Sequence, residues 1–260
     1  MNSKVKQKVF GDEGYSADMR LDPQDLDKLR RIINDHWLAT ISAAYPELAE
    51  EAARLGIENY HLISDRIDHK KLWTKTNRVL PQEAVTEIKK MPFIARLKEE
   101  FGEFEISDVY DVQQRPTSEE IYWRLVRPEV PTDVGLLHAD KWFHIAVGMG
   151  PEMFPVGKVS VKVWIPIYCE PGKNGLAIVP GSHHRQWKFH VEYVDGLGKP
   201  IIDEDTSKIP AELMHTEPGN MLIFHENTLH GGVVNHGRKT RVSMEITMLM
   251  PDVPLTRIRN

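Results

Sequence analysis

The feature that most constrains the fold of this chain is a change of pattern at Phe104. From there on, short runs rich in β-branched and aromatic residues alternate with Pro, Gly and Asn, a pattern that predicts antiparallel strands. The runs are Ile121–Val126, Val159–Tyr168, Leu176–Val179, Met221–Phe224 and Arg241–Leu249. Several of them are almost continuously apolar, which is typical of strands that are covered on both faces. We therefore expect a mainly β fold, a jelly roll or barrel.

The first hundred residues have the spacing of helices instead. Asp22 precedes Pro23, so a capping carboxylate stands before a proline at the first helical position. The apolar residues that follow recur every three or four positions, at Leu26, Leu29, Ile33, Trp37 and Ile41. This spacing indicates a long helix with one buried face. Further helices are expected to begin near Pro46, Pro81 and Pro92, and two of them to end at Gly56 and Gly102.

These patterns predict one domain over residues 1–260, a length within reach of a single β domain with additions. Residues 1–103 form a mainly helical layer and residues 104–250 the β core. The 38 residues between Pro180 and Gly219 are the least regular part of that core. A segment of that length without regular structure is usually functional, disordered or wrongly assigned.

Bulk composition narrows the setting in which the chain works. A net charge of -5 and a pI near 6.2 provide no general field for attracting nucleic acid. No stretch approaches the roughly 20 apolar residues that span a bilayer, and the first dozen residues lack the pattern of a secretory signal. The single cysteine, Cys169, excludes an intramolecular disulfide and a multi-cysteine metal site. We expect a cytoplasmic protein with a small-molecule partner, no nucleic-acid partner and no membrane insertion.

The residues that point to chemistry begin with His138 and Asp140. They lie two positions apart, so on an extended backbone both side chains project to the same face and could share one ion. His230, which follows a predicted strand, is the expected third ligand, in preference to His225 within that strand. Two imidazoles and one carboxylate leave three positions of an ion open, as in non-haem Fe(II) oxygenases. The alternative is a hydrogen-bonded pair that is purely structural.

A second pair, Arg241 and Ser243, lies eleven residues or more beyond His230 on one face of the last predicted strand. A guanidinium grips a carboxylate through two parallel charge-assisted hydrogen bonds, and a nearby hydroxyl can donate a third. We expect this pair to anchor a dicarboxylate whose 2-oxo acid end reaches the metal. The competing interpretation of Arg241 is an ordinary surface arginine.

In these residues the sequence resembles the phytanoyl-CoA dioxygenase-like branch of the 2-oxoglutarate-dependent oxygenases. The resemblance spans roughly Ile121 to Met250 and rests on an ordered set of motifs: His138-Ala139-Asp140, the stretch from Asn174 to His183, His230, and Arg241-Val242-Ser243. It implies a double-stranded β-helix, and Fe(II) bound by the two histidines and Asp140. It also implies 2-oxoglutarate held by the Arg–Ser pair and O2 as the second cosubstrate.

The reaction that the resemblance implies is hydroxylation or desaturation of a small organic substrate, with release of succinate and CO2. Related halogenases typically lack the carboxylate ligand, so Asp140 argues against halogenation. Two other functions stay open. One is a cupin-like domain that binds a ligand without turnover, and the other is a metal-dependent hydrolase that uses the same triad. Neither gives the downstream arginine a role.

Overall fold

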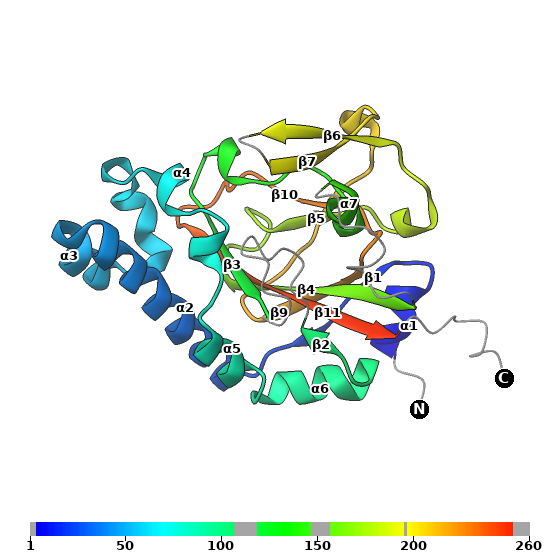
Figure 1. Ribbon diagram of the computed structural model, residues 1–260, viewed down its shortest axis with the longest axis horizontal. Helices are drawn as coiled ribbons and strands as arrows, with labels where there is room; N and C mark the ends of the chain where they lie inside the picture. Colours follow the sequence, from blue (N-terminus) through cyan, green and yellow to red (C-terminus); the bar gives the residue numbers. More distant parts are fainter. Residues whose placement is uncertain (1–3, 107–118, 147–156, 195–196, 252–260) are drawn as a thin grey trace.

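The computed structural model describes residues 4–106, 119–146, 157–194 and 197–251 (Figure 1). Its helices are α1 Lys4–Phe10, α2 Pro23–Ala44, α3 Ala49–Leu55, α4 His69–Leu72, α5 Gln82–Ile88, α6 Pro92–Phe101 and α7 Asp140–Ala146. Its strands are β1 Tyr15–Arg20, β2 Glu105–Ile106, β3 Ile121–Val126, β4 Lys158–Tyr168, β5 Leu176–Ile178, β6 Phe189–Val194, β7 Leu197–Ile202, β8 Glu212–Leu213, β9 Asn220–His225, β10 His230–Gly232 and β11 Arg241–Pro251.

The strands form a large sheet and a smaller one that faces it. The large sheet has the order β1-β9-β4-β11-β2, with β3 also paired to β11, and the smaller sheet has the order β10-β5-β8. The pairings between these strands are antiparallel. Helices α2, α5 and α6 lie along the outside of the large sheet, α3 packs against α2 farther from the sheet, and the hairpin β6–β7 lies beyond the smaller sheet (Figure 1). This is the jelly roll with an N-terminal helical layer that the sequence predicts.

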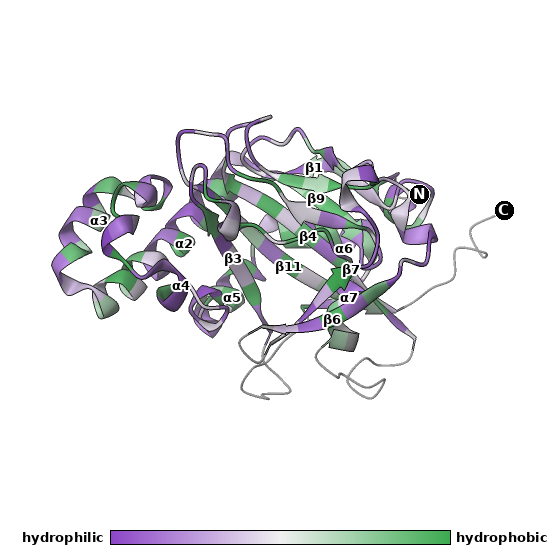
Figure 2. Ribbon diagram, turned by 90° about the horizontal axis from the view of Figure 1, so that it is seen from above, coloured by the Kyte–Doolittle hydropathy of each residue, from purple (hydrophilic) through white to green (hydrophobic). Residues whose placement is uncertain are grey.

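Helix α2 docks on the large sheet through the expected face. Leu29, Ile33, Trp37 and Ile41 are fully buried, and they share one apolar cluster with the outer face of β3, β4 and β11. In Figure 2, α2 alternates between hydrophilic and hydrophobic segments, whereas β9 is hydrophobic over most of its length. The expected ends at Gly56 and Gly102 are confirmed, since both adopt a positive φ that glycine tolerates. Burial of the shared cluster joins the helical layer to the sheet.

Local details of the helix starts differ from the sequence prediction. Asp22 occupies the position before α2, but its side chain caps no backbone N–H and lies 3.5 Å from Arg96 Nη1 instead. The buried Asp25 accepts a hydrogen bond from the backbone N of Phe93 at 3.1 Å and so satisfies a donor at the start of α6. Asp22 therefore does not cap α2, whereas Asp25, within the first turn of α2, accepts from the start of α6.

Two segments are more β-rich than their sequences suggest. Strand β1 lies within the part predicted to be mainly helical and pairs with β9, with Tyr15 opposite Phe224. Its Ser, Asp and Arg have low strand propensity, so pairing with β9 determines its conformation. The stretch between Pro180 and Gly219, predicted to be irregular, contains the hairpin β6–β7 and strand β8. The pairings of β1 with β9 and of β8 with β5 are long-range, whereas β6–β7 is a local hairpin.

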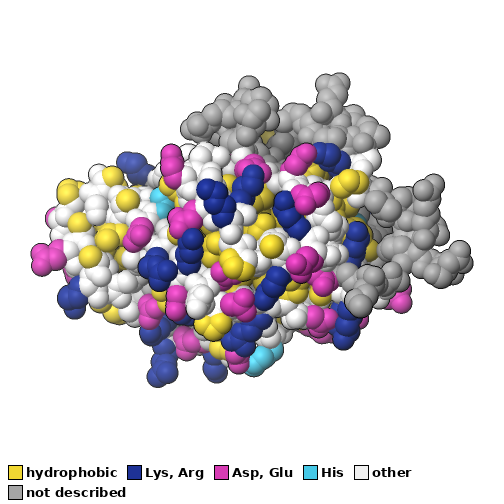
Figure 3. All heavy atoms as spheres, turned by 90° about the horizontal axis from the view of Figure 1, so that it is seen from below, with side chains coloured by type: hydrophobic (Ala, Val, Ile, Leu, Met, Phe, Trp, Pro, Cys, Tyr) yellow, Lys and Arg dark blue, Asp and Glu magenta, His cyan; other side chains and the backbone are white. Residues whose placement is uncertain are grey.

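The surface is mixed in charge where it can be seen. On the face shown in Figure 3, Lys and Arg alternate with Asp and Glu over the described residues, so no concentrated positive field forms on that face. Among the described residues, no helix combines the length and the apolar character needed to cross a membrane.

Candidate metal centre and anion anchor

His138 and His230 are held side by side by their own backbones. The N–H of each donates to the carbonyl of the other at 2.9 Å, which forms an isolated antiparallel bridge. A Cβ on Gly231 would lie 3.2 Å from the backbone of Leu137, so glycine after His230 permits this close approach. The backbone pair therefore depends on neither imidazole.

The two imidazoles are oriented alike. Nδ1 of His138 lies 2.6 Å from the carbonyl oxygen of Leu136, and Nδ1 of His230 lies 3.0 Å from that of Thr228. A proton on each Nδ1 donates to these carbonyls, which leaves each Nε2 as a lone-pair donor. Burial and the neighbouring His230 lower the pKa of His138 to about 4, so it is neutral at pH 7. Imidazoles that present a free Nε2 atom in this way are metal ligands.

Asp140 completes the cluster from the first position of α7, not from an extended strand as the spacing argument assumed. Its Oδ1 lies 3.8 Å from Nε2 of His138 and 3.6 Å from Nε2 of His230. One ligand atom from each of the three residues lies within 4.8 Å of the others. The turn into α7 thus brings the carboxylate to the histidines by a different route, with the expected result.

The electrostatics keep Asp140 ionised. Burial by itself would raise the pKa of this carboxyl, but Lys162 and the two histidines outweigh that effect and hold the pKa well below its usual range. Nζ of Lys162 lies 3.4 Å from Oδ2, whereas the distances to the two histidines are to Oδ1. Oδ1 is therefore the oxygen that faces the two Nε2 atoms.

Glu226 fixes the start of α7. The sequence analysis did not identify it. Its buried carboxylate pairs with Nζ of Lys141 at 2.7 Å and accepts hydrogen bonds from the backbone N and the hydroxyl of Ser160. The carbonyl of Glu226 also accepts from the backbone N of Lys141. An acidic residue in a loop carries no sequence signal for this role, because its partners come from α7 and β4.

Arg241 and Ser243 lie buried at the beginning of β11, and each has a donor without a partner. Arg241 Nη1 donates to the carbonyl of Gly175 at 2.8 Å, but its Nε and the hydroxyl of Ser243 find no hydrogen-bond partner among the described residues. Burial and the nearby Arg124 lower the pKa of Arg241 to about 10, so the guanidinium stays charged at pH 7. A buried cation and hydroxyl in this state suit an anionic ligand.

An apolar patch connects this pair to the histidines. The guanidinium of Arg241 lies over the ring of Trp164, 5.6 Å from its centroid. Trp164 belongs to the same buried cluster as Phe224, whose ring centroid lies 4.4 Å from that of His230. The three candidate metal ligands and the candidate anchor therefore border one continuous patch of the jelly-roll interior.

A buried amide pair holds the turn that leads into β11. Asn174 Nδ2 donates to Asn235 Oδ1 at 2.7 Å, and Asn235 Nδ2 donates to the carbonyls of Val126 and Lys239. Asn174 belongs to one of the motifs on which the family resemblance rests, whereas Asn235 gave no sequence signal. Ser182, in the same stretch, accepts from the backbone N of Leu229 at 2.8 Å and so fixes the residue before His230.

Replacing Asn235 with alanine should therefore lower the free energy of unfolding by about 2–4 kcal/mol, because it leaves several buried polar groups unsatisfied. Urea unfolding measures the loss. Asn77→Ala is the matched control, because its amide makes one partly exposed bond, to the carbonyl of Leu72. Equal losses in the two variants would contradict a special role for Asn235.

Other histidine, arginine and aromatic side chains in this half of the chain have partners of their own. His225, the rival ligand, packs against Phe10 and His183. His190 pairs with Asp203 on the exposed hairpin, and Arg127 is held by the buried Asp133. Trp142 stacks on Phe189, with ring centroids 4.6 Å apart, and is core. Phe143, in contrast, meets His138 edge to face at 5.1 Å and so adjoins the candidate metal centre.

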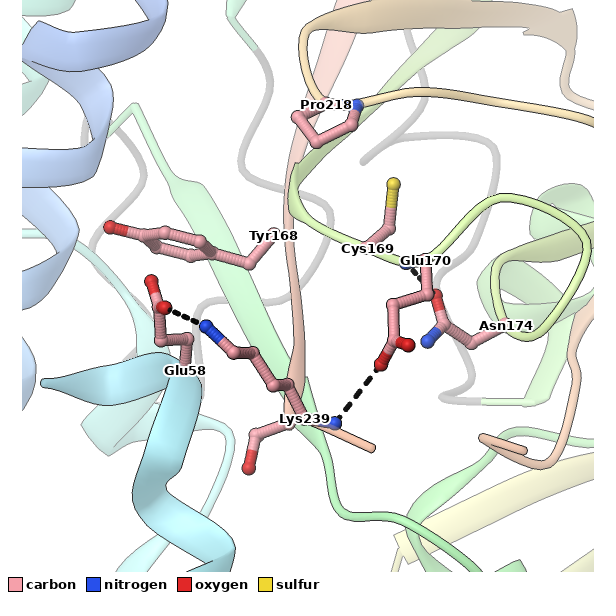
Figure 4. Close-up of a pocket in the computed structure, with 8 residues that line it drawn as sticks. Glu58, Tyr168, Cys169, Glu170, Asn174, Pro218 and Lys239 are labelled. Carbon is pink, nitrogen blue, oxygen red and sulfur yellow. Dashed lines mark hydrogen bonds and ion pairs between the residues drawn. The ribbon is translucent and has the colours of Figure 1, made fainter. Parts of the chain in front are cut away.

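A pocket also opens outside this centre, where β4 ends and β11 begins (Figure 4). It is lined by Glu58, Tyr168, Cys169, Glu170, Asn174, Pro218, Lys239 and Thr240. Glu58 pairs with Lys239 across it, and Glu170 accepts from the backbone N of Lys239. Burial raises the pKa of the Cys169 thiol to about 12, so it is no nucleophile at neutral pH.

Comparison with solved structures yields relatives of similar fold at low identity. The non-heme monooxygenase ThoJ, in its apo form, has a TM-score of 0.55 and 13% identity, over 96% of this chain and 79% of that one. EctD from S. alaskensis has a TM-score of 0.50 and 14% identity, over 95% and 76%. The epimerase SnoN, solved with Fe3+ and alpha ketoglutarate, has a TM-score of 0.50 and 13% identity, over 95% and 82%. No curated protein matches the sequence.

The jelly roll, the cluster of two histidines and one carboxylate, and the family match together define a class of enzyme: a non-haem iron oxygenase that uses 2-oxoglutarate and O2. Within that class, the model of the family "Phytanoyl-CoA dioxygenase (PhyH)" matches residues 23–243, most of the chain. The chain belongs to the phytanoyl-CoA dioxygenase family.

Proposed function

We propose that the protein hydroxylates or desaturates a small organic substrate, with Fe(II) held by His138, Asp140 and His230. The observation that carries this proposal is the convergence of Asp140 Oδ1 on the two Nε2 atoms, at 3.8 and 3.6 Å. Two imidazoles and one carboxylate are the donor set of non-haem Fe(II) oxygenases. The residues present therefore fit the metal.

The residues also fit 2-oxoglutarate. The distal carboxylate of 2-oxoglutarate would accept hydrogen bonds from the donors of Arg241 and Ser243 that have no partner. Both residues are almost fully buried. The apolar surface of Trp164 beside the guanidinium would cover the methylene groups of the cosubstrate. This assignment gives a role to the buried arginine that a hydrolase or a non-catalytic binding domain leaves unexplained.

Bound iron, with 2-oxoglutarate and O2, supplies the oxidising chemistry, and the protein supplies position and exclusion of water. The carbonyls of Leu136 and Thr228 fix the rotation of the two imidazoles. Lys162 holds Oδ2 of Asp140, so the carboxylate presents one oxygen to the histidines. The carboxylate ligand leaves no place for a halide in the triad, which favours hydroxylation or desaturation over halogenation.

The whole chain acts as one catalytic domain in this proposal. The helical layer and the large sheet share a continuous apolar core that contains Trp37 from α2 and Trp123 from β3. A cytoplasmic setting is supported by the free, partly buried Cys169. The partner is a small molecule, since the centre lies within a jelly roll rather than on an open basic surface.

Anaerobic addition of Fe(II) and 2-oxoglutarate to the metal-free protein tests the proposal directly. We expect a weak visible charge-transfer band that requires both additions, followed by succinate release when O2 is admitted. A Zn(II)-loaded sample is the control and should give neither signal. Folded, iron-loaded protein that shows neither the band nor succinate would favour a binding domain, and hydrolytic turnover with Zn(II) would favour the hydrolase.

A further inference from the structure

A set of charged side chains lies on the inner face of the large sheet, beside the candidate metal centre. We call it the inner-face cluster, and its members are Arg78, Arg124, Asp140, Lys162, Arg241 and Glu245. Strand β11 lies between β3 and β4, and Glu245 of β11 is in register with Tyr122 on one side and Trp164 on the other. The cluster therefore crosses three adjacent strands from Asp140 towards the edge strand β3.

Glu245 is the central carboxylate of the cluster. Its Oε1 accepts from Nε of Arg124 at 3.0 Å, and its charge interacts with those of Lys162, Asp140 and Arg78. Lys162 in turn donates to the hydroxyl of Thr247 at 2.8 Å and pairs with Asp140. The carboxylate of Glu245 is thus shared among three cations, and the two arginines among them keep donors that Glu245 does not use.

The guanidinium of Arg124 has donors that are not used within the cluster. Its Nε is taken by Glu245, but neither Nη atom has a hydrogen-bond partner among the described residues, and 44% of the side chain is exposed. Ser243 lies opposite Arg124 in the β3–β11 register. The free donors therefore lie one strand away from the proposed 2-oxoglutarate anchor, on the same face.

Arg78 adds a second cation from the segment beside β3. It donates to the backbone carbonyls of Trp73 and Trp123 at 3.1 and 3.5 Å, and no described residue accepts from its Nη2. Burial and the like charge of Arg124 lower its pKa to about 9. A cation that is desolvated beside another cation and bonded to neutral carbonyls is stabilised when an anion binds next to it.

The net charge of the cluster also favours an anionic ligand. Its four cations and two carboxylates leave an excess of two positive charges, because Asp133, which also acts on Arg241, is itself paired with Arg127. Fe(II) and the 2-oxoglutarate dianion would cancel each other, so loading the enzyme does not remove this excess. A partly buried site with uncompensated charge favours a ligand of the opposite charge.

We propose that Arg78 and Arg124 form a subsite for a carboxylate or phosphate group of the primary substrate, which is therefore an anion. The inference rests on the proposed function, because it places the subsite next to an iron centre already loaded with 2-oxoglutarate. The charge of Arg124 acts both on Arg78 and on the candidate ligand His138, so an anionic group held there would orient the remainder of the substrate towards the metal.

The test uses full-length protein loaded anaerobically with Fe(II) and saturating 2-oxoglutarate, so that Arg241 is already occupied. Methyl phosphate, acetate and the neutral analogue acetamide are titrated at constant ionic strength, and the midpoint of thermal unfolding is followed. Wild type is compared with Arg78→Gln, Arg124→Gln and the charge-preserving Arg124→Lys. Arg20→Gln, which removes an equal charge from an exposed position on β1, is the control.

We expect one of the two anions to raise the unfolding midpoint saturably, while acetamide does not. A stronger response to methyl phosphate assigns a phosphate group to the substrate, and a stronger response to acetate a carboxylate. Each Arg→Gln variant should require about 10- to 100-fold more anion. Arg124→Lys should recover part of the affinity, and Arg20→Gln should match wild type.

Two results would overturn the inference. One is the absence of any saturable response in wild type up to roughly 50 mM anion, well above the millimolar range expected for so small a ligand. The other is an unchanged response in folded Arg78→Gln and Arg124→Gln. The charge-transfer band is recorded in the same samples. Its absence would contradict the proposed function, whereas its presence without an anion response contradicts only the subsite.

Discussion

His138→Ala and Asp140→Ala are each expected to abolish turnover and to weaken Fe(II) binding by more than about 100-fold. Loss of an outer partner of a ligand costs 10- to 100-fold in metal affinity, so loss of a ligand itself should exceed that range. The fold should survive His138→Ala, because the bridge to His230 is made by backbone atoms. Equilibrium titration with Fe(II) and circular dichroism separate the loss of metal from the loss of structure.

His225→Ala is the matched control for this prediction. It removes an imidazole from the neighbouring strand β9, five residues before His230, where the ring packs against Phe10. Iron affinity should stay within about threefold of wild type, since structural substitutions away from a metal site do not remove a ligand. Full activity in His138→Ala, or loss of iron in His225→Ala, would show that the triad is wrongly assigned.

The sequence indicated the strands well because their signal is local. The runs at β3, β4, β9 and β11 are apolar and bounded by turn residues, and their predicted limits agree with the structure to within two residues. Strand β1 carried no such signal, because its polar sequence becomes a strand through pairing with β9. Local composition predicts an element when its own side chains determine it, and misses it when a distant strand does.

In the candidate site, too, some residues are recognisable from local sequence and others only from distant contacts. The spacing of His138 and Asp140 indicated a shared ion, although the turn into α7, rather than an extended strand, brings Asp140 into place. Lys162 and Glu226 were not anticipated, because their roles depend on contacts with residues more than 20 positions away. Motif spacing identifies the groups that would touch a metal, whereas the groups that orient them become visible only in three dimensions.

Arg241→Ala should raise the concentration of 2-oxoglutarate needed for half-maximal turnover by at least about 100-fold, because two charge-assisted hydrogen bonds of about 1.5–3 kcal/mol each are lost. Arg241 is 3% exposed, so solvent cannot replace its guanidinium. Ser243→Ala removes a single neutral donor and should cost less, about 10-fold. Titration of the charge-transfer band with 2-oxoglutarate measures both effects without a known substrate.

A loss of 2-oxoglutarate affinity without a loss of Fe(II) affinity would distinguish an anchor from an arginine that only supports the fold. Arg241→Ala should leave Fe(II) affinity unchanged, because among the described residues the rings of Trp164 and Phe224 lie between the guanidinium and the triad. Arg241→Lys should fall between wild type and alanine, since an ammonium keeps the charge but cannot form the paired bonds. If Arg241→Ala weakened iron and 2-oxoglutarate binding equally, the arginine would be supporting β11 through Gly175 rather than holding the cosubstrate.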